Sequence, residues 1–238
     1  MSNDDFKYRI DIGSNEMAIV REALEEIFPF WKELLPEEKE MVKENARVET
    51  YGKGVVINRT TEECKGLMAV RAGQLRTYIL SEEGREVTLF RVQEGEICVL
   101  SASCLMDSII FDVLIEAMEP TEVIIIPSSV LHQIKAKNPY VELYLYKTAT
   151  EKFSDVMWTM QQILFLRIDQ RVAAFLWDEM QRQKSMTITV THDEIARYIG
   201  SAREVVTKVL RYLAQEKVVE LKRGKIEIVN KEKLKRLL

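Results

Sequence analysis

The chain has 238 residues, 47% of them hydrophobic and 30% charged, which is the balance of a globular protein with one large or two small domains. No apolar run reaches the roughly 18–20 residues that span a bilayer, and the acidic residues 1–5 do not resemble a signal peptide. Three cysteines and two histidines, without a C-x-x-C pair, argue against a disulfide framework and a structural zinc site. We therefore expect a cytoplasmic protein with no metal and no membrane partner.

The net charge of −4 is unevenly distributed along the chain. Residues 167–238 carry 16 Lys and Arg against 10 Asp and Glu, a balance of +6, whereas residues 1–166 carry 18 against 28, a balance of −10. A basic C-terminal third behind an acidic body favours a polyanionic partner for that third alone, although a solvated charged surface would give the same counts.

The first half of the chain changes from a helical to a β-rich pattern. Residues 16–46 have apolar positions at helical spacing, interrupted by Pro29, and Pro36 suits the first turn of a second short helix. From about residue 48 to 127 the chain consists of short β-rich runs between glycines, and residues 81–84 suit a hairpin connection. Examples of these runs lie at residues 54–57, 66–70, 77–80, 87–90 and 122–126. They predict a small antiparallel sandwich or barrel.

A long helix is predicted from about residue 138 to 166, because apolar residues recur there at spacings of three or four, close to a coiled-coil seam. The stripe consists of Leu145, Ala149, Phe153, Val156, Met160 and Ile163. A helix this apolar on one stripe needs a partner, which is either its own barrel or the same helix of a second copy. Both arrangements can hold on different faces.

The last third predicts a helix-turn-helix followed by a wing. A helix at residues 167–183 and a short strand at 187–190 precede the capping-box sequence Thr191-His192-Asp193-Glu194, which opens a helix that stops at Gly200. Ser201-Ala202-Arg203-Glu204 is a second capping-box sequence, opening a helix from Ala202 to about Gln215. The expected wing strands, 218–221 and 225–229, are joined at Arg223-Gly224, and a basic helix follows.

The second helix of this motif is the expected DNA-reading element, because in a helix-turn-helix it enters the major groove. Arg donates two hydrogen bonds to guanine and Glu accepts from cytosine, whereas hydroxyl contacts to phosphate position the protein without specifying sequence. The alternative is a solvated helix face for Arg203 and Lys208, and simple capping for Glu204. Packing of the two helices is assigned to Ala196, Val206, Val209, Leu210 and Leu213. The predicted DNA-contacting residues are Thr191, Ser201, Arg203, Glu204, Thr207, Lys208 and Arg211.

The segment from Thr191 to Leu210 resembles the signature of the Crp/Fnr family of bacterial regulators, through its Ile-Ala pair, its turn glycine, its Arg-Glu pair and the basic residue four positions later. The resemblance covers most of the chain and implies an α+β fold. This fold has an N-terminal antiparallel β-roll of double-stranded β-helix, jelly-roll or cupin-like type, a long dimerisation helix, and a C-terminal winged helix-turn-helix. The implied domains are an effector-sensing domain with N-terminal helices, the dimerisation helix and the DNA-binding domain, at residues 1–137, 138–166 and 167–238. Lys208 stands where family members usually have Arg, which leaves the DNA sequence read by the protein open.

The implied effector pocket departs from that of the cyclic-nucleotide-binding members of the family. Phe111-Asp112 stands where those members have the Arg-Ser pair that holds a phosphate, and Leu100 stands near the position of their ribose-binding Glu. The resemblance therefore implies an effector that is not a cyclic nucleotide, with a weak preference for an aromatic or other organic ligand. Cys98 and Cys104 are either a thiol sensor or buried small hydrophobes. The residues predicted to line the effector pocket are Cys98, Val99, Leu100, Cys104, Phe111, Asp112, Val156 and Met157.

We predict a homodimer that binds a palindromic operator in double-stranded DNA, placing two recognition helices roughly 34 Å apart. An unknown small molecule or redox signal controls it, and RNA polymerase is a further partner if the protein activates transcription. Residues 1–63 lack the cysteine cluster of an iron–sulfur member, and no haem ligand pair is evident, so no cofactor is predicted. No catalytic constellation supports an enzyme. The alternative is a ligand-binding regulatory β-domain whose winged tail contacts another protein.

Overall fold

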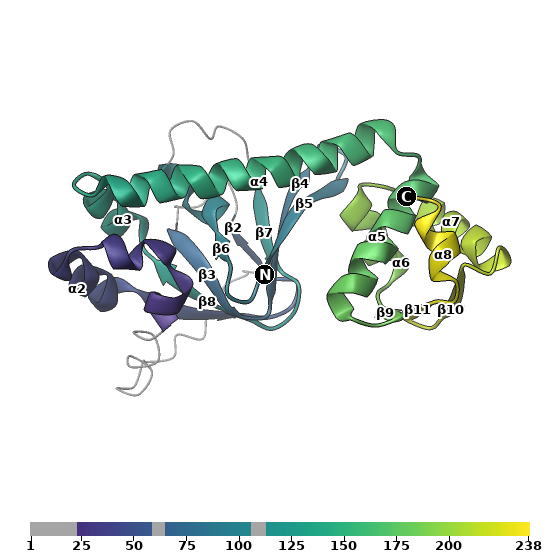
Figure 1. Cartoon of the computed structure of the whole chain (residues 1–238), viewed down its shortest axis with the longest axis horizontal. Coiled ribbons are helices and arrows are strands. Elements are labelled where there is room, and N and C mark those ends of the chain that lie inside the picture. Colours follow the sequence, from purple (N-terminus) through teal and green to yellow (C-terminus); the bar gives the residue numbers. More distant parts are fainter. Residues whose placement is uncertain (1–22, 59–64, 106–112) are drawn as a thin grey trace, which may run out of the picture. The chain divides into compact units, whose positions relative to one another are not determined.

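The computed structural model describes residues 23–58, 65–105 and 113–238. Contacts within the chain divide it into two units, the first comprising Met1–Tyr78 and Phe90–Ser154 and the second Ile79–Leu89 and Asp155–Leu238. Most of the β-rich part belongs to the first unit, and the helices and short strands of the C-terminal third belong to the second (Figure 1). Buried apolar side chains form a core in each unit.

Short helices precede the β-rich part of the first unit. Residues 23–27 are helical, and they are followed by the 3-10 helix η1 (Pro29–Glu33) and by α2 (Pro36–Asn45). Pro36 is the first residue of α2, as predicted, because at that position the missing amide hydrogen leaves no hydrogen bond unmade. Residues 16–22 of the predicted N-terminal helix lie outside the described residues.

Two four-stranded sheets make up the β-rich part (Figure 1). The first has the order β1 (Arg47–Tyr51), β8 (Thr121–Ile126), β3 (Leu67–Ala72) and β6 (Ile97–Cys98). The second has the order β2 (Val56–Asn58), β7 (Leu114–Ala117), β4 (Gln74–Leu80) and β5 (Glu86–Gln93). Strand β8 pairs antiparallel with β1 and β3, and β7 pairs antiparallel with β2 and β4, which confirms the predicted antiparallel β class.

The residues in the two turns on either side of β4 explain the conformations of these turns. Between β3 and β4, Gly73 has φ +87°, and a Cβ there would lie 2.6 Å from the carbonyl oxygen of Pro120, so that only glycine fits. Between β4 and β5, the amide of Ser81 donates to the carbonyl of Arg85 at 2.8 Å, and the amide of Gly84 donates to the carbonyl of Ser81 at 2.9 Å. The hairpin predicted at residues 81–84 is confirmed.

A buried ion pair links β4 and β7. Arg76 and Glu116 are cross-strand neighbours, and the Arg76 Nη1 atom lies 3.0 Å from the Glu116 Oε2 atom. The guanidinium of Arg76 also stacks over the ring of Tyr78, 4.2 Å from its centroid. Because either charge alone would be costly to bury, the pair favours one register between these two strands.

After the 3-10 helix η2 (Val99–Leu105) and β8, the chain forms α3 (Ser128–Lys135) and the long helix α4 (Pro139–Phe165). Helix α4 has 27 residues and is therefore about 40 Å long. Asn138 precedes it, and its side-chain amide donates to Glu38 Oε2 at 2.8 Å and to the carbonyl of Glu33 at 2.9 Å. None of the helices in the described ranges combines the length and hydropathy that crossing a membrane requires.

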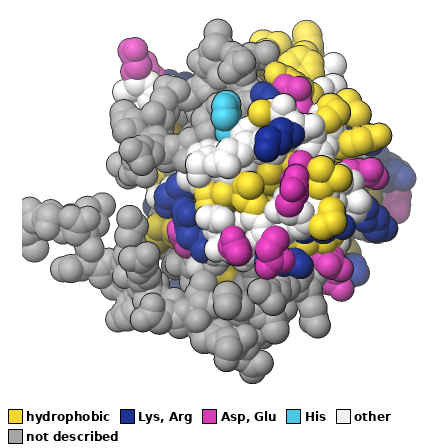
Figure 2. Space-filling view, turned by 90° about the vertical axis from the view of Figure 1, so that its left-hand side faces the viewer, with side chains coloured by type: hydrophobic (Ala, Val, Ile, Leu, Met, Phe, Trp, Pro, Cys, Tyr) yellow, Lys and Arg dark blue, Asp and Glu magenta, His cyan; other side chains and the backbone are white. Residues whose placement is uncertain are grey.

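One face of the first unit mixes both signs of charge among its described side chains (Figure 2). Figure 2 faces the side that lies at the left of Figure 1, near α2 and α3. Among the described side chains on this face, Lys and Arg are interspersed with Asp, Glu and apolar residues. This face therefore lacks, in the described part, the continuous basic patch that a polyanion would favour.

The second unit contains the predicted helix-turn-helix and wing. Its elements after α4 are α5 (Ile168–Gln183), β9 (Thr187–Thr189), α6 (His192–Ile199), α7 (Arg203–Gln215), β10 (Val219–Lys222), β11 (Lys225–Ile228) and α8 (Lys231–Lys235). The strands form a sheet in the order β10-β11-β9, with Gly224 at φ +70° in the turn of the wing. A buried cluster from α5, α6, α7 and the three strands forms the core.

Candidate nucleic-acid interface

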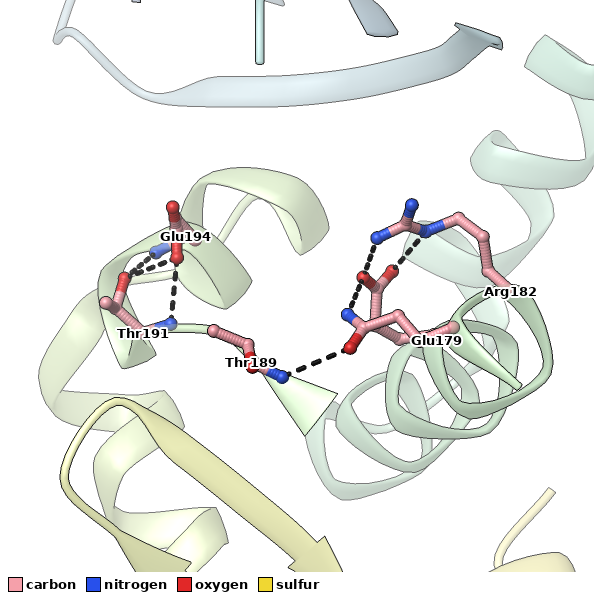
Figure 3. A network of polar contacts seen from close by, with 6 residues as sticks. Glu179, Arg182, Thr189, Thr191 and Glu194 are labelled. Atoms are coloured by element: carbon pink, nitrogen blue, oxygen red, sulfur yellow. Dashed lines mark hydrogen bonds and ion pairs between the residues drawn. The ribbon is translucent and has the colours of Figure 1, made fainter. Parts of the chain in front are cut away.

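The first helix of the motif, α6, begins and ends as the sequence predicts. The amide of Glu194 donates to Thr191 Oγ1 at 3.2 Å, and the amide of Thr191 donates to Glu194 Oε2 at 2.8 Å, which completes a capping box (Figure 3). Gly200 ends the helix in the left-handed conformation, at φ 66°. Thr191, a predicted DNA-contacting residue, therefore has its hydroxyl engaged within the protein.

A side-chain network fixes the strand that leads into α6. Glu179, which is buried on α5, accepts hydrogen bonds from Arg182 and from Gln183 Nε2, the latter at 2.6 Å. The Gln183 Oε1 atom in turn accepts from the amide of Thr189 at 3.2 Å (Figure 3). The end of α5 thus holds β9 directly before the capping box of α6.

The second predicted capping box, at residues 201–204, is not formed. Helix α7 begins at Arg203, one residue later than predicted, and its N-cap Ala202 offers no side-chain hydrogen bond. The amide of Ser201 donates instead to the carbonyl of Ala196 at 2.9 Å, so that Ser201 belongs to the turn that closes α6. The capping role considered for Glu204 is therefore wrong, and its carboxylate is left exposed.

The packing of α7 divides its residues as predicted. All five residues assigned to the helix–helix contact, Ala196, Val206, Val209, Leu210 and Leu213, are buried. The opposite face of α7 is exposed at Arg203, Glu204, Lys208 and Arg211, whereas Thr207 is half-buried.

The exposed charges of α7 are not neutralised by neighbouring side chains. Within the described residues, no hydrogen bond or ion pair involves the side chains of Arg203, Glu204, Lys208 and Arg211. Some other cations of the same unit are paired, as Arg167 is with Asp169 and Lys222 with Glu227. The uncommitted charges on α7 are therefore available to a partner with complementary groups.

Sequence reasoning missed a contact between the two helices of the motif. His192 Nδ1 lies 3.0 Å from Thr207 Oγ1, so the hydroxyl of a predicted DNA-contacting residue is tied to α6. Burial lowers the pKa of His192, and the positive charges of Arg203 and Arg211 lower it further, so that the imidazole is neutral at pH 7. Because the two residues are 15 positions apart, no local pattern could have paired them.

A cleft of about 490 Å³ lies between the start of α6, the start of α7 and the wing. Its lining includes the basic side chains of Arg203, Lys222 and Lys225 as well as His192 and the acidic Asp193. Lys222 and Lys225 were not among the predicted DNA-contacting residues. Their position on either side of the predicted wing turn Arg223-Gly224 is the one feature of the sequence that could have identified them.

The predicted effector pocket is only partly described. Cys98, Val99 and Leu100 are buried in the first unit, whereas Val156 is half-buried and Met157 is exposed on α4. Phe111 and Asp112 lie outside the described residues, as does the side chain of Cys104. Within the described ranges, no group of three or more His, Cys, Asp and Glu side chains is arranged to hold a metal ion.

Cys98 has the environment of a structural thiol. Burial raises the pKa of the Cys98 thiol to about 11. The thiolate is the reactive form, and the Cys98 side chain, which is fully buried, is held as the thiol and shielded from solvent. For this cysteine the structure favours the buried-hydrophobe interpretation over the thiol sensor.

We expect Cys98 to resist alkylation in the folded protein. In native protein treated with iodoacetamide at pH 7.5, Cys98 should remain unmodified after an hour, as read from fragment ions that separate it from Cys104 on the same peptide. The same peptide in guanidinium chloride, where the thiol is exposed, should be labelled within minutes and serves as the control. Equal labelling rates in the two conditions would show that Cys98 is an accessible thiol.

Helix α4 carries apolar side chains on two faces, which corrects the predicted single stripe. Leu145 is buried and Ala149 and Val156 are half-buried, whereas Phe153, Met160 and Ile163 are exposed. The predicted stripe joined residues from both faces, because spacings of three and four fit either one. A heptad-spaced set of exposed apolar residues is formed by Tyr146, Phe153, Met157, Met160 and Leu164.

A β-roll, a long helix and a winged helix-turn-helix in one chain define a DNA-binding transcriptional regulator. Residues 170–237 match the model of the Crp-like helix-turn-helix domain, and residues 48–138 match that of the cyclic nucleotide-binding domain. A solved structure from Eubacterium rectale ATCC 33656, described as a candidate transcriptional regulator of the Crp/Fnr family, is 42% identical in sequence, with a TM-score of 0.85. The match covers 89% of this chain and 98% of that one. The protein belongs to the Crp/Fnr family.

Two curated relatives are more distant. The transcriptional activator protein FnrA of Stutzerimonas stutzeri is 26% identical over 186 residues, which cover 75% of each chain. The fumarate and nitrate reduction regulatory protein of Yersinia pestis is 24% identical over 196 residues, covering 78% of this chain and 76% of the relative. These relatives are regulators and not enzymes, which agrees with the absence of a predicted catalytic constellation.

Proposed function

We propose that the protein is a homodimeric regulator that reads a palindromic DNA operator through the exposed face of α7. The observation that carries this proposal is the set of uncommitted charges at Arg203, Glu204, Lys208 and Arg211. Arg203 and Glu204 lie in the first turn of α7, the part of a recognition helix that contacts base edges. Arg203 is assigned to guanine and Glu204 to cytosine, with Lys208 as a further, less directional contact.

We assign the remaining predicted residues to the phosphate backbone. The cleft beside the wing is lined by Arg203 and Lys225, which suit a phosphate of the duplex, whereas Lys222 on the same lining is paired with Glu227. Ser201 and Arg211 are also assigned to phosphates, and the Thr191 and Thr207 hydroxyls would have to exchange their contacts with Glu194 and His192 to reach one. Such contacts fix the orientation of the protein on DNA and contribute no base specificity of their own.

Dimerisation is assigned to the exposed heptad face of α4. Tyr146, Phe153, Met157, Met160 and Leu164 form an apolar stripe that a second copy of the same helix would cover. A twofold dimer would present two α7 helices to one face of DNA, about one helical turn apart, and would therefore prefer a palindrome. Residues 138–166 are then the dimerisation helix, between a sensing domain at residues 1–137 and a DNA-binding domain at residues 167–238.

The controlling signal is assigned to an effector other than a cyclic nucleotide, because Phe111-Asp112 replaces the phosphate-holding Arg-Ser pair. The segment between α4 and α5, at residues 165–169, is the proposed hinge through which the effector biases DNA binding. A cytoplasmic location suits a protein that acts on DNA. Contact with RNA polymerase is proposed for the case that the protein is an activator, as FnrA is named.

The proposal is tested by selecting duplexes from a random pool with the full-length protein and measuring their affinity against salt. We expect a palindromic consensus and an affinity that falls steeply between 50 and 200 mM salt, by roughly 10³-fold or more if about six phosphates are contacted. Salt-insensitive binding, or no binding to any duplex with or without candidate effectors, would favour the alternative in which the winged tail contacts protein.

A further inference from the structure

An apolar side chain interrupts the polar face of α7. Val205, the third residue of the helix, is 39% exposed and follows Arg203 and Glu204 in sequence. The other apolar residues in this part of the helix, Val206, Val209 and Leu210, are all buried. Valine is also a poorer helix former than alanine, because its branched side chain loses rotamer freedom in a helix. Neither burial nor local helix stability therefore accounts for a valine at this position.

The spacing of α7 divides its outward face into two flanks. Arg203, Thr207 and Arg211 recur every four residues on the flank that faces His192, and Arg203 also lines the cleft beside the wing. Val205 and Lys208, three residues apart, lie on the other flank together with the exposed Tyr212. Val205 is therefore an exposed apolar group in the first turn of α7, on the flank opposite Arg203.

The major groove offers one kind of apolar group, the C5 methyl of thymine, which packs against aliphatic side chains. The neighbours of Val205 are less suited to this contact, since Arg203, Glu204 and Lys208 end in charged groups and Thr207 is half-buried with its hydroxyl bound to His192. We infer that Val205 is a specificity-determining residue that selects thymine at one position of each operator half-site. This inference rests on the proposed function of α7 and adds a base position to it.

The test removes only the methyl group from the DNA. The consensus duplex selected by the full-length wild-type protein is remade with each thymine replaced in turn by deoxyuridine, and affinities are measured by fluorescence anisotropy. We expect one thymine in each half-site to respond to this replacement. There the wild-type protein should bind the deoxyuridine duplex about fourfold more weakly for each half-site replaced than it binds the thymine duplex, because one buried methyl is lost. Val205→Ser should bind the thymine and deoxyuridine duplexes with equal affinity, and Val205→Ala, whose methyl reaches less far, should discriminate less than the wild type.

Val229→Ala is the matched control, because Val229 is another exposed valine, 56% accessible, that follows the wing strand β11 outside α7. This variant should keep the wild-type preference for thymine. Thermal melting should show that Val205→Ala is at least as stable as the wild type.

The inference is overturned if a consensus is selected but no thymine responds to loss of its methyl, or if the responding position responds equally in Val205→Ala. In both cases the proposed function of α7 would stand. If the wild-type protein selects no sequence at all, the proposed function fails and this inference fails with it.

Discussion

Phe153→Glu should convert the protein to a monomer and weaken its binding to the selected operator by about 100-fold or more. Phe153 is 61% exposed on α4 and lies within the heptad-spaced apolar stripe. In a twofold dimer the substitution places two like charges in an apolar interface, and an uncompensated buried charge costs about 3–5 kcal/mol. In a dimer, binding of one recognition helix raises the effective concentration of the second helix at its half-site. A monomer loses this gain, which contributes about 10²–10⁴-fold to affinity.

Sedimentation analysis and mobility shift on the same samples check this expectation. Gln161→Glu is the matched control, because Gln161 is exposed on the same helix, outside the heptad stripe, and the substitution adds the same charge. This control should remain dimeric and bind DNA normally. A Phe153→Glu protein that is still a dimer at micromolar concentration would show that the dimer uses another surface.

Arg203→Ala should weaken operator binding by about 30-fold or more and relax the sequence preference at one position of each half-site. A bidentate Arg–guanine contact contributes about 1–3 kcal/mol of discrimination, and a dimer makes the contact twice. The operator affinity of Arg203→Lys should lie between those of the wild type and Arg203→Ala. The lysine ammonium keeps the positive charge but cannot make the two parallel hydrogen bonds of a guanidinium. Because Arg203 is exposed and makes no hydrogen bond or ion pair with any described residue, its replacement should change the free energy of unfolding by less than about 0.5 kcal/mol.

Repeating the duplex selection with each variant measures affinity and preference together. Lys32→Ala removes the same charge from η1 in the first unit, where the side chain is exposed, and should leave both unchanged. An unchanged consensus for Arg203→Ala would assign this residue to the phosphate backbone, and the base-reading role would then have to move to other residues of α7.

Much of the C-terminal third was predictable because its signals are local. A Thr and a Glu three residues apart form the capping box of α6, Gly200 ends the helix, and Arg223-Gly224 turns the wing. The same reasoning failed at Ser201, where an identical spacing of Ser and Glu does not form a box. The backbone amide of Ser201 donates instead to the carbonyl of Ala196, in the turn that closes α6. Ser201 is therefore part of this turn and does not cap α7, and the residues at 201–204 alone do not show which arrangement forms.

The β-rich part was predictable as a class and less so in its details. The five predicted runs correspond to strands, whereas β1, β6 and β7 were not among them. Strand β6 has only two residues, and β1 alternates charged and apolar residues that also fit other structures. These strands exist because a longer neighbour pairs with them, as β8 does with β1 and β4 with β7.

By itself the sequence determined the type of protein: where the helix-turn-helix lies, how α6 is capped, and which residues of α7 face inward. These features depend on residues within a few positions of one another, so the local pattern is sufficient. Only the tertiary structure decided which apolar residues of α4 remain exposed, that His192 holds Thr207, and that Glu204 is free of a capping role. Those outcomes depend on contacts between residues distant in sequence, whose burial and hydrogen bonds arise only when the chain is folded.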